Sequence, residues 1–290
     1  MSVWRSPAKI NWWLRVLDRR PDGFHDIETV FQEIALHDTL ELDALPGRDE
    51  CLIEGMPGGV ETRSNLIWRA WDALRSEYPD RVGGAVVHVT KRIPMGGGLG
   101  GGSSNAATTL KALADLYSLP ATSDDLRAVA SRLGSDTAFF IRGGCQVGRG
   151  RGELLEPVAA PAHPVGLVLV FPSQGVSTAW AYAELSRRGR PSPPMSLPEF
   201  LRILGPAEPA ALAGAVHNDF EVVVSGLPWF GEAREALLRA GCTTAFLSGS
   251  GSTVVGVVPK EKNSREIART LQESLRLKVE ATVSKRPEGG

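Results

Sequence analysis

The sequence predicts an α+β fold in two domains, and two observations carry this prediction. In the first half, a β-branched stretch at 85–90 leads into a glycine-rich loop, and a stretch with helical periodicity follows. In the second half, strand, small-residue loop, strand, helix and strand patterns follow one another toward the end of the chain. A proline- and alanine-rich segment at 157–164 lies between the halves. We therefore expect domains at residues 1–156 and 157–290.

The composition limits the class of protein. The chain has 290 residues and a formal net charge of −1, which gives no electrostatic reason to expect nucleic acid or an anionic membrane as a partner. Its three cysteines are far apart, without metal-ligand spacing, so neither a metal site nor a disulfide framework is expected. The longest apolar run, 165–171, is too short to span a bilayer, and the N-terminus lacks the apolar core of a signal peptide. These features predict a cytoplasmic protein.

The elements of the first half follow from periodicity and turn signals. Proline, aspartate and glycine at 21–23 predict a turn between two strands, and 38–42 alternates like an edge strand. The other expected elements are a loop at 46–62, an amphipathic helix at 65–75, a strand at 85–90, a helix at 106–117, a helix capped at 123–125 and ended by Gly134, and a glycine- and arginine-rich turn at 143–152.

The second half predicts a sandwich of helices on one face of a sheet. A buried strand at 165–171 opens it, and 196–199 has the residues of a capping box. The other expected elements are a short helix that contains Trp180 and Tyr182, a loop at 187–194, a helical stretch from 217, a helix at 229–240, strands at 242–247 and 253–258 around a small-residue loop, a helix at 265–275, a strand at 277–283 and a tail at 285–290.

The glycine-rich loop is the clearest functional signal. Glycines without a Cβ let the backbone adopt positive φ and come close to a ligand, and the unpaired amides of a helix start attract anions. A loop of this kind, running from a strand into a helix, predicts a phosphate-binding site, and the alternative is a hinge or a plain helix cap. It is neither a Walker A motif nor a good dinucleotide fingerprint. Its residues are Pro94, Met95, Gly96, Gly97, Gly98, Leu99, Gly100, Gly101, Gly102, Ser103 and Ser104.

Three single residues outside the loop allow two interpretations each. Lys9 at a strand start is either a solvated surface charge or a functional cation. His25, after an aromatic residue and a turn, is either a loop residue or a ligand-binding group. Asp136 lies between a helix end and an apolar run, so it either caps the next helix or is a carboxylate held at a cleft.

Three stretches together resemble the GHMP kinase superfamily, which includes galactokinase and the homoserine, mevalonate and phosphomevalonate kinases. They are residues 7–11 (PAKIN), 94–107 and 247–255 (LSGSGSTVV). Further similarity, to the branch of the family that acts on a cytidyl substrate, lies at 22–25 (DGFH), 31–32 (FQ), 133–136 (LGSD) and 218–219 (ND). The resemblance runs from about residue 6 to about residue 284.

The resemblance implies an activity and a set of partners. It implies a two-domain fold with an ATP-binding N-terminal domain and a C-terminal α/β sandwich domain with an antiparallel sheet. The implied cofactors are ATP and Mg²⁺, with no firm assignment of metal ligands. The implied reaction is phosphorylation of the 2-hydroxyl of 4-diphosphocytidyl-2-C-methyl-D-erythritol, in the non-mevalonate route to isoprenoid precursors.

The resemblance also implies roles for particular residues. Lys9 and Asp136 match the catalytic lysine and aspartate, and residues 96–104 match the triphosphate loop. The implied substrate-binding residues are Asn11, Phe24, His25 and Tyr182, with the two aromatic rings on either side of the cytosine and the histidine bonded to it.

Two features depart from the family pattern. After Ser135-Asp136 the chain has threonine and alanine at 137–138, where the family often has valine and proline. The tryptophan pair at 12–13 is bulkier than expected beside Asn11. The alternatives kept open are another small-molecule kinase of the superfamily, of homoserine or mevalonate type, and a nucleotide-binding regulator without catalysis.

Overall fold

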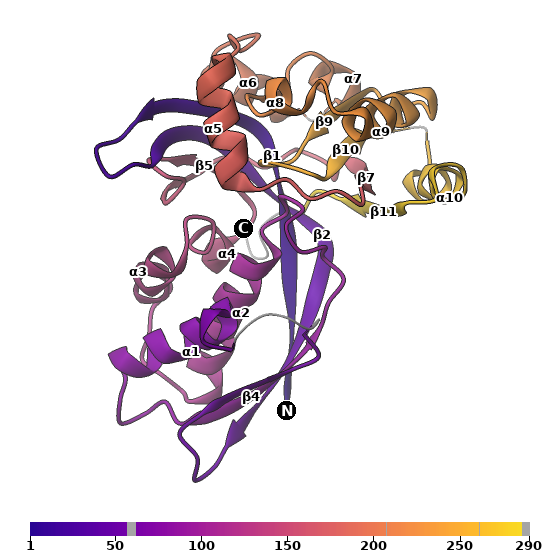
Figure 1. Cartoon of the computed structure of the whole chain (residues 1–290). Coiled ribbons are helices and arrows are strands. Elements are labelled where there is room, and N and C mark those ends of the chain that lie inside the picture. The colour runs from indigo at the N-terminus through magenta and orange to yellow at the C-terminus, as the bar shows by residue number, and fades with distance from the viewer. Residues whose placement is uncertain (57–61, 207, 261, 286–290) are drawn as a thin grey trace. The chain divides into compact units, whose positions relative to one another are not determined.

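The computed structural model describes residues 1–56, 62–206, 208–260 and 262–285 (Figure 1). The chain forms two compact units, each assembled from separate segments of sequence. Unit 1 consists of Met1–Ala8, Leu36–Met95 and Gly100–Gly143, and unit 2 consists of Lys9–Ala35, Gly96–Leu99 and Gly144–Gly290. The two longest strands, β1 (Ser2–Arg19) and β2 (His25–Leu45), contribute residues to both units.

In unit 1, the first part of β1 and the last part of β2 form a sheet with β3 and β4, and helices accompany it. Strand β4 (Gly84–Thr90) pairs antiparallel with the last part of β2, from Thr39 to Leu45, and parallel with β3 (Cys51–Glu54). Figure 1 shows α1, α2 and α3 gathered on one side of β4. The helical elements are η1 (Thr62–Ser64), α1 (Leu66–Glu77), α2 (Gly101–Leu116), α3 (Ser123–Leu133) and α4 (Phe139–Arg142).

Local chemistry explains where these helices begin. The Asn65 side chain accepts a hydrogen bond from the Ile67 amide at the start of α1. Helix α3 begins with a capping box between Thr122 and Asp125, one residue earlier than the cap that the sequence predicted. The apolar sides of both helices are buried, as their periodicity predicted.

Unit 2 contains a four-stranded antiparallel sheet in the order β11-β7-β10-β9. Helices α9 and α10 pack against this sheet, and valine and leucine side chains fill the space between them. Trp13 and Leu14 of β1 pair parallel with β8, while the first part of β2 pairs with β5 and β5 pairs with β6. The strands of this unit are β5 (Cys145–Arg149), β6 (Leu154–Pro157), β7 (Gly166–Phe171), β8 (His217–Asn218), β9 (Thr244–Leu247), β10 (Val254–Val257) and β11 (Lys278–Val283).

The helices of unit 2 match most of the sequence expectations. The capping box at Ser196 and Glu199 is present, and helix α9 ends just before Gly241. The helices are α5 (Thr178–Arg188), α6 (Leu197–Leu204), α7 (Pro209–Leu212), α8 (Glu221–Val224), α9 (Pro228–Arg239) and α10 (Ser264–Leu275). The α+β class and the antiparallel sheet of the second half are therefore confirmed. The predicted tail lies outside the described residues beyond Lys285.

Four local predictions were wrong. The segment 38–42 is not an edge strand, because β2 pairs with β4 there and lies beside β1. The segment 143–152 is not simply a turn, because half of it is β5. Part of the predicted loop at 46–62 forms β3, and the stretch from 217 begins with the short strand β8.

Candidate functional site

The glycine-rich loop connects β4 to α2, and its backbone requires glycine at particular positions. Gly96, Gly98 and Gly100 have φ values of 70°, 76° and 69°. A Cβ at Gly98 would lie 2.1 Å from the carbonyl oxygen of Ser248, whereas one at Gly96 would meet no atom within 4 Å. Gly98 is therefore required by a close backbone contact, and Gly96 only by its dihedral angle.

Residues 96–99 of the loop are bonded to other parts of unit 2. The Thr253 amide donates to the Gly97 carbonyl oxygen at 3.2 Å, and the Ser248 hydroxyl donates to that of Gly98 at 3.1 Å. The Lys9 amide donates to the Leu99 carbonyl oxygen at 3.0 Å. The second small-residue loop is itself held by Asn218, whose amide nitrogen donates to the carbonyl oxygens of residues 247 and 249 at 2.8 Å each. These bonds fix this part of the glycine loop beside Lys9 and beside the loop 248–252.

Lys9 and Asn11 are both buried on β1. The Lys9 ammonium donates to Asn11 Oδ1 at 2.7 Å and lies 5.4 Å from the centroid of the Phe31 ring. A Cβ at Gly249 would lie 3.4 Å from Lys9 Nζ, so the ammonium lies next to the second small-residue loop. The surface-charge interpretation of Lys9 is therefore wrong, since its side chain is buried between two loops of small residues.

The first turn of α2 belongs to unit 1 and is supported by a buried polar network. Ser6 donates to Ser104 Oγ at 2.8 Å. With its amide turned to satisfy every partner, Asn105 donates to Ser6 Oγ at 2.7 Å and to Asp38 Oδ2 at 3.0 Å. Lys91 pairs with the Asp38 carboxylate, which also accepts the amides of residues 92 and 93. Ser6 thus gives its single hydroxyl proton to Ser104, and both side chains are fully buried at the start of α2.

Asp136 lies in the turn between α3 and α4 and is half-buried. It does not cap α4, because the N-cap of that helix is Ala138, with no side-chain cap bond. Thr137, where the family often has valine, is buried, and its hydroxyl has no hydrogen-bond partner among the described residues. Asp136 belongs to unit 1 and Lys9 to unit 2, so their pairing stays a prediction.

The predicted base-binding residues lie at the start of β2 and on α5. The rings of His25 and Tyr182 are stacked, with centroids 5.1 Å apart and planes 17° from parallel, and Tyr182 meets Phe220 edge-on. Burial lowers the pKa of His25, and the positive charges of Arg19 and Arg190 lower it further. The Phe24 ring is 54% exposed and lies under the guanidinium of Arg151. Tyr182 thus lies against His25, and a role for Phe24 in stacking stays a prediction.

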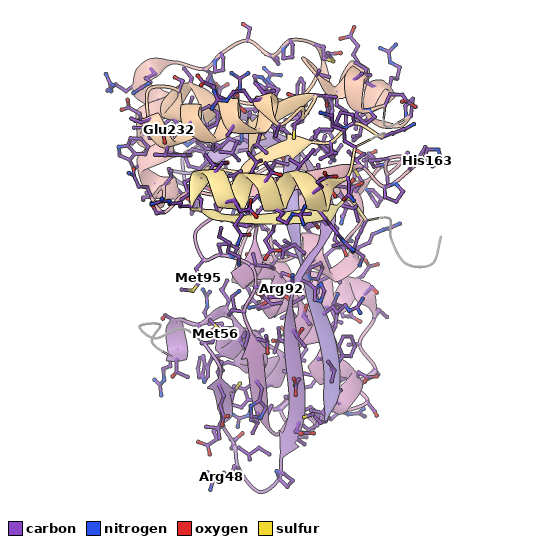
Figure 2. All side chains as sticks on the ribbon, turned by 90° about the vertical axis from the view of Figure 1, so that its right-hand side faces the viewer. Arg48, Met56, Arg92, Met95, His163 and Glu232 are labelled. Atoms are coloured by element: carbon purple, nitrogen blue, oxygen red, sulfur yellow. The ribbon has the colours of Figure 1, made fainter. Side chains whose placement is uncertain are left out.

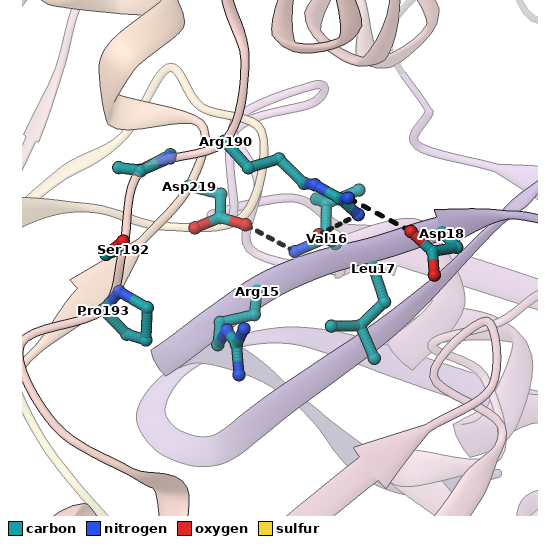
Figure 3. Close-up of a pocket in the computed structure, with 9 residues that line it drawn as sticks. Arg15, Val16, Leu17, Asp18, Arg190, Ser192, Pro193 and Asp219 are labelled. Carbon is teal, nitrogen blue, oxygen red and sulfur yellow. Dashed lines mark hydrogen bonds and ion pairs between the residues drawn. The ribbon is translucent and has the colours of Figure 1, made fainter.

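A pocket of about 370 Å³ lies beside β1 in unit 2 (Figure 3). Figure 3 shows Asp219 accepting a hydrogen bond from the Val16 amide, at 2.7 Å, and Arg190 donating to the Val16 carbonyl oxygen at 3.2 Å. Arg190 also pairs with Asp18. These bonds attach the segment after α5 to β1 close to His25, so Arg190 joins the residues that surround the candidate base site.

Several polar residues of the site were missed by sequence reasoning. Thr29 and Asp38 are fully buried, and Ser6 is too. Their signal is a polar residue at an inward position of a strand, where the alternation calls for an apolar side chain. Met95, which the sequence placed in the phosphate loop, is exposed in unit 1 (Figure 2).

Among the described residues, no group of three or more histidine, cysteine, aspartate or glutamate side chains could hold a metal ion. None of the described helices combines the length and apolar character that crossing a bilayer requires.

The chain was compared with protein families and with known proteins. The chain matches the GHMP kinases N terminal domain over residues 65–144 and the GHMP kinases C terminal region over residues 206–277. The 4-diphosphocytidyl-2-C-methyl-D-erythritol kinase of Synechococcus sp. is 40% identical over 93% of this chain and 88% of the relative. The enzyme of that name from Geobacter metallireducens is 38% identical, over 93% of this chain and 94% of the relative.

Solved structures agree with the sequence comparison. The crystal structure of a 4-(cytidine 5'-diphospho)-2C-methyl-D-erythritol kinase covers all of both chains, with a TM-score of 0.80 and 32% identity. A homoserine kinase from Cytophaga hutchinsonii has a TM-score of 0.73 at 18% identity, over 99% of this chain and 95% of the other, which shows a shared fold. With both family regions present and 40% identity over 93% of its length, the chain belongs to the GHMP kinase family.

Proposed function

We propose that the chain transfers the γ-phosphoryl group of ATP to the 2-hydroxyl of 4-diphosphocytidyl-2-C-methyl-D-erythritol. It is an ATP-dependent small-molecule kinase, because its family and its relatives over most of the chain are kinases of this kind. The structural observation that carries the proposal is the bond from the Lys9 amide to the Leu99 carbonyl oxygen, at 3.0 Å. It holds a buried lysine next to a loop whose conformation suits phosphate.

Residues 94–104 are proposed to bind the triphosphate. Positive-φ glycines bring backbone amides close to the phosphates, and the start of α2 adds unpaired amides and the positive end of a helix dipole. The buried Ser104 hydroxyl, which accepts from Ser6, is proposed to support this loop from within α2.

Asp136 and Lys9 are proposed to carry the chemical step. The Asp136 carboxylate accepts the proton of the substrate 2-hydroxyl. The electron pair of that oxygen forms a bond to the γ-phosphorus, while the bond from this phosphorus to the β–γ bridging oxygen breaks and its pair leaves with ADP. The Lys9 ammonium stabilises the negative charge that develops on the attacking oxygen.

The donor set of the chain fits a magnesium ion that arrives with ATP. Mg²⁺ takes oxygen ligands and keeps several waters, with phosphates completing its shell, so a protein site built from several carboxylates is not needed. The partly buried Ser103 hydroxyl in the first turn of α2 is an oxygen donor of the kind that such an ion accepts. When bound, the ion would neutralise charge on the β- and γ-phosphate oxygens.

The cytidyl group is proposed to bind at His25 and Tyr182, with Phe24 on its other side. A neutral imidazole offers one donor and one acceptor to the base edge, and burial together with Arg19 and Arg190 favours that neutral form. His25 is stacked on one face of the Tyr182 ring, so we expect the base to stack on the opposite face. Substrates without the cytidyl group would leave these polar atoms unpaired.

The experiment measures ATP consumption with 4-diphosphocytidyl-2-C-methyl-D-erythritol, homoserine or mevalonate as the acceptor. We expect turnover with the cytidyl substrate, and a loss of at least about 10²-fold in kcat for Asp136→Asn, which is the scale of losing a general base. The matched control is Asp124→Asn, an exposed carboxylate on α3. Preference for another acceptor would refute the substrate, ATP binding without turnover of any alcohol would favour a regulator, and full activity of Asp136→Asn would remove that residue from the chemistry.

Two further expectations accompany this proposal. The three cysteines are unpaired and buried, which supports a reducing, cytoplasmic setting. The division of the sequence at residue 156 is proposed for the family domains, because the two family matches fall on either side of it.

A further inference from the structure

A chain of three short hydrogen bonds runs through the interior of unit 2 and ends at Lys9. The Thr29 hydroxyl donates to the Trp13 carbonyl oxygen at 2.7 Å. The Asn11 amide nitrogen donates to Thr29 Oγ1 at 2.8 Å. The Lys9 ammonium donates to Asn11 Oδ1 at 2.7 Å. Thr29 is fully buried and Asn11 is 1% exposed, so water does not compete for these bonds.

The direction of this chain is fixed by counting protons. A threonine hydroxyl has one proton, and Thr29 gives it to a main-chain carbonyl oxygen, which can only accept. Thr29 Oγ1 is therefore left as an acceptor toward Asn11. The Asn11 amide must turn its nitrogen to Thr29, and its oxygen must face the opposite way, toward Lys9.

The reversed orientation of Asn11 would be unfavourable at both ends. Its nitrogen would then face the Lys9 ammonium, donor against donor at the 2.7 Å that now separates Nζ from Oδ1. Its oxygen would face Thr29 Oγ1, whose proton is already committed to Trp13. Both ends would then hold buried polar atoms without a hydrogen-bond partner, which disfavours this rotamer.

We propose that Thr29 is a positioning residue for the phosphoryl-transfer step: through Asn11 it fixes where the Lys9 ammonium lies. This inference rests on the proposed role of Lys9. The anchor of the chain is the backbone of β1 at Trp13, in the same strand that carries Lys9. The geometry of the ammonium is thereby set by main-chain atoms of β1, through the side chains of Thr29 and Asn11.

The test compares Thr29→Val, which keeps the shape and removes the hydroxyl, with Thr29→Ser, which keeps the hydroxyl. We expect Thr29→Val to lower kcat by about 10- to 100-fold, because a shift of a catalytic group by about 1 Å can lower the rate by up to about 100-fold. The KM for ATP should change less than about threefold. Thr29→Ser should retain kcat within about threefold of wild type.

A double-mutant cycle separates positioning from a purely structural role. In an Asn11→Ala background the chain of bonds is already broken, so adding Thr29→Val should leave kcat unchanged within about twofold. Equal losses in both backgrounds would overturn the proposal, because a general loss of packing would act regardless of Asn11. Wild-type kcat in Thr29→Val would overturn it as well.

A spectroscopic measurement keeps the inference independent of the substrate. In protein labelled with ¹⁵N-asparagine, the Asn11 side-chain NH₂ signal, assigned by its loss in Asn11→Ala, should exchange slowly with solvent in wild type and in Thr29→Ser. We expect its protection to fall at least about tenfold in Thr29→Val. If the wild-type protein does not phosphorylate the cytidyl substrate, the proposed function fails, and the Asn11 signal alone tests the chain of hydrogen bonds. Unchanged protection of this signal in Thr29→Val would refute the positioning role of Thr29.

Discussion

Replacing Gly98 by alanine places a methyl carbon 2.1 Å from the carbonyl oxygen of Ser248 and 3.1 Å from that of Gly251. Both neighbours are main-chain atoms, so neither can rotate away as a side chain could. The φ of Gly98 is 76°, in the region that an alanine also avoids. Two separate costs therefore arise, one from the dihedral angle and one from the collision.

Gly96 provides a control that has only the first cost. Its φ is 70°, close to that of Gly98, but a Cβ there would meet nothing within 4 Å. The left-handed conformation costs an alanine about 1–2 kcal/mol in either variant. The gain from restricting the unfolded chain is also common to both. Overpacking adds about 1–3 kcal/mol at Gly98 alone.

The assay is thermal unfolding of wild type, Gly96→Ala and Gly98→Ala, followed by circular dichroism without nucleotide. A difference of about 1–3 kcal/mol corresponds to a Tm for Gly98→Ala roughly 2–12 °C below that of Gly96→Ala. Indistinguishable Tm values for the two alanine variants would show that the loop does not press against Ser248. The argument that residues 96–99 are held by this loop would then fail.

Two other predictions concern titration and reactivity. The pKa of His25 in the folded protein lies below its ordinary value of 6.5. As the pH falls from 6.5 toward the folded pKa, the unfolded chain therefore binds the proton more readily than the folded chain. The free energy of unfolding decreases over this range. Because the neutral imidazole is the form proposed to bind the base, the KM for the cytidyl substrate should be constant above pH 6.5 and rise as the pH falls below the folded pKa. The same rise of KM at low pH in His25→Gln would contradict this prediction. Burial raises the pKa of Cys51 and Cys145 to about 12 and that of Cys242 to about 11. Since the thiolate is the reactive form, mass spectrometry should find no iodoacetamide adduct on folded protein at pH 8 and three adducts in urea, and rapid labelling of the folded chain would be the contrary result.

Elements with strong local signals could be predicted from the sequence. The helix after the glycine loop, the capping box at Ser196 and the strand at 166–171 all follow from residues that are neighbours in the chain. The roles of individual glycines in the loop did not follow from sequence. Only the structure separates Gly98, which touches main-chain atoms, from Gly96, which does not.

The misread strand β5 shows how glycine can mislead. Gly148 looked like part of a turn, yet it lies within a strand that pairs on both sides. A Cβ there would lie 2.8 Å from the Phe31 ring, so this glycine makes room for an aromatic side chain more than a hundred residues earlier. Such a neighbour is invisible to a pattern that covers a few consecutive positions.

The supporting polar residues of the site were unpredictable for a similar reason. Asp38 is bonded to Lys91 and to the amides that follow it, and Ser6 to Ser104 and Asn105. Partners this far apart in sequence are set by strand pairing, which periodicity does not specify. The resemblance to the family pointed to Lys9, Asn11 and Asp136, but not to the buried groups around them.

The order in which the segments of unit 2 occur in the chain has a consequence for protein synthesis. Lys9–Ala35 belongs to this unit, yet its other large segment, Gly144–Gly290, is synthesised more than a hundred residues later. At about 5–20 residues per second, the early segment waits on the order of 10–50 s for its partners. During that time Trp12 and Trp13 lack the aromatic neighbours Phe246 and Phe200 that cover them in the finished protein. The nascent chain therefore exposes an apolar tryptophan pair until the second half of the chain has been made.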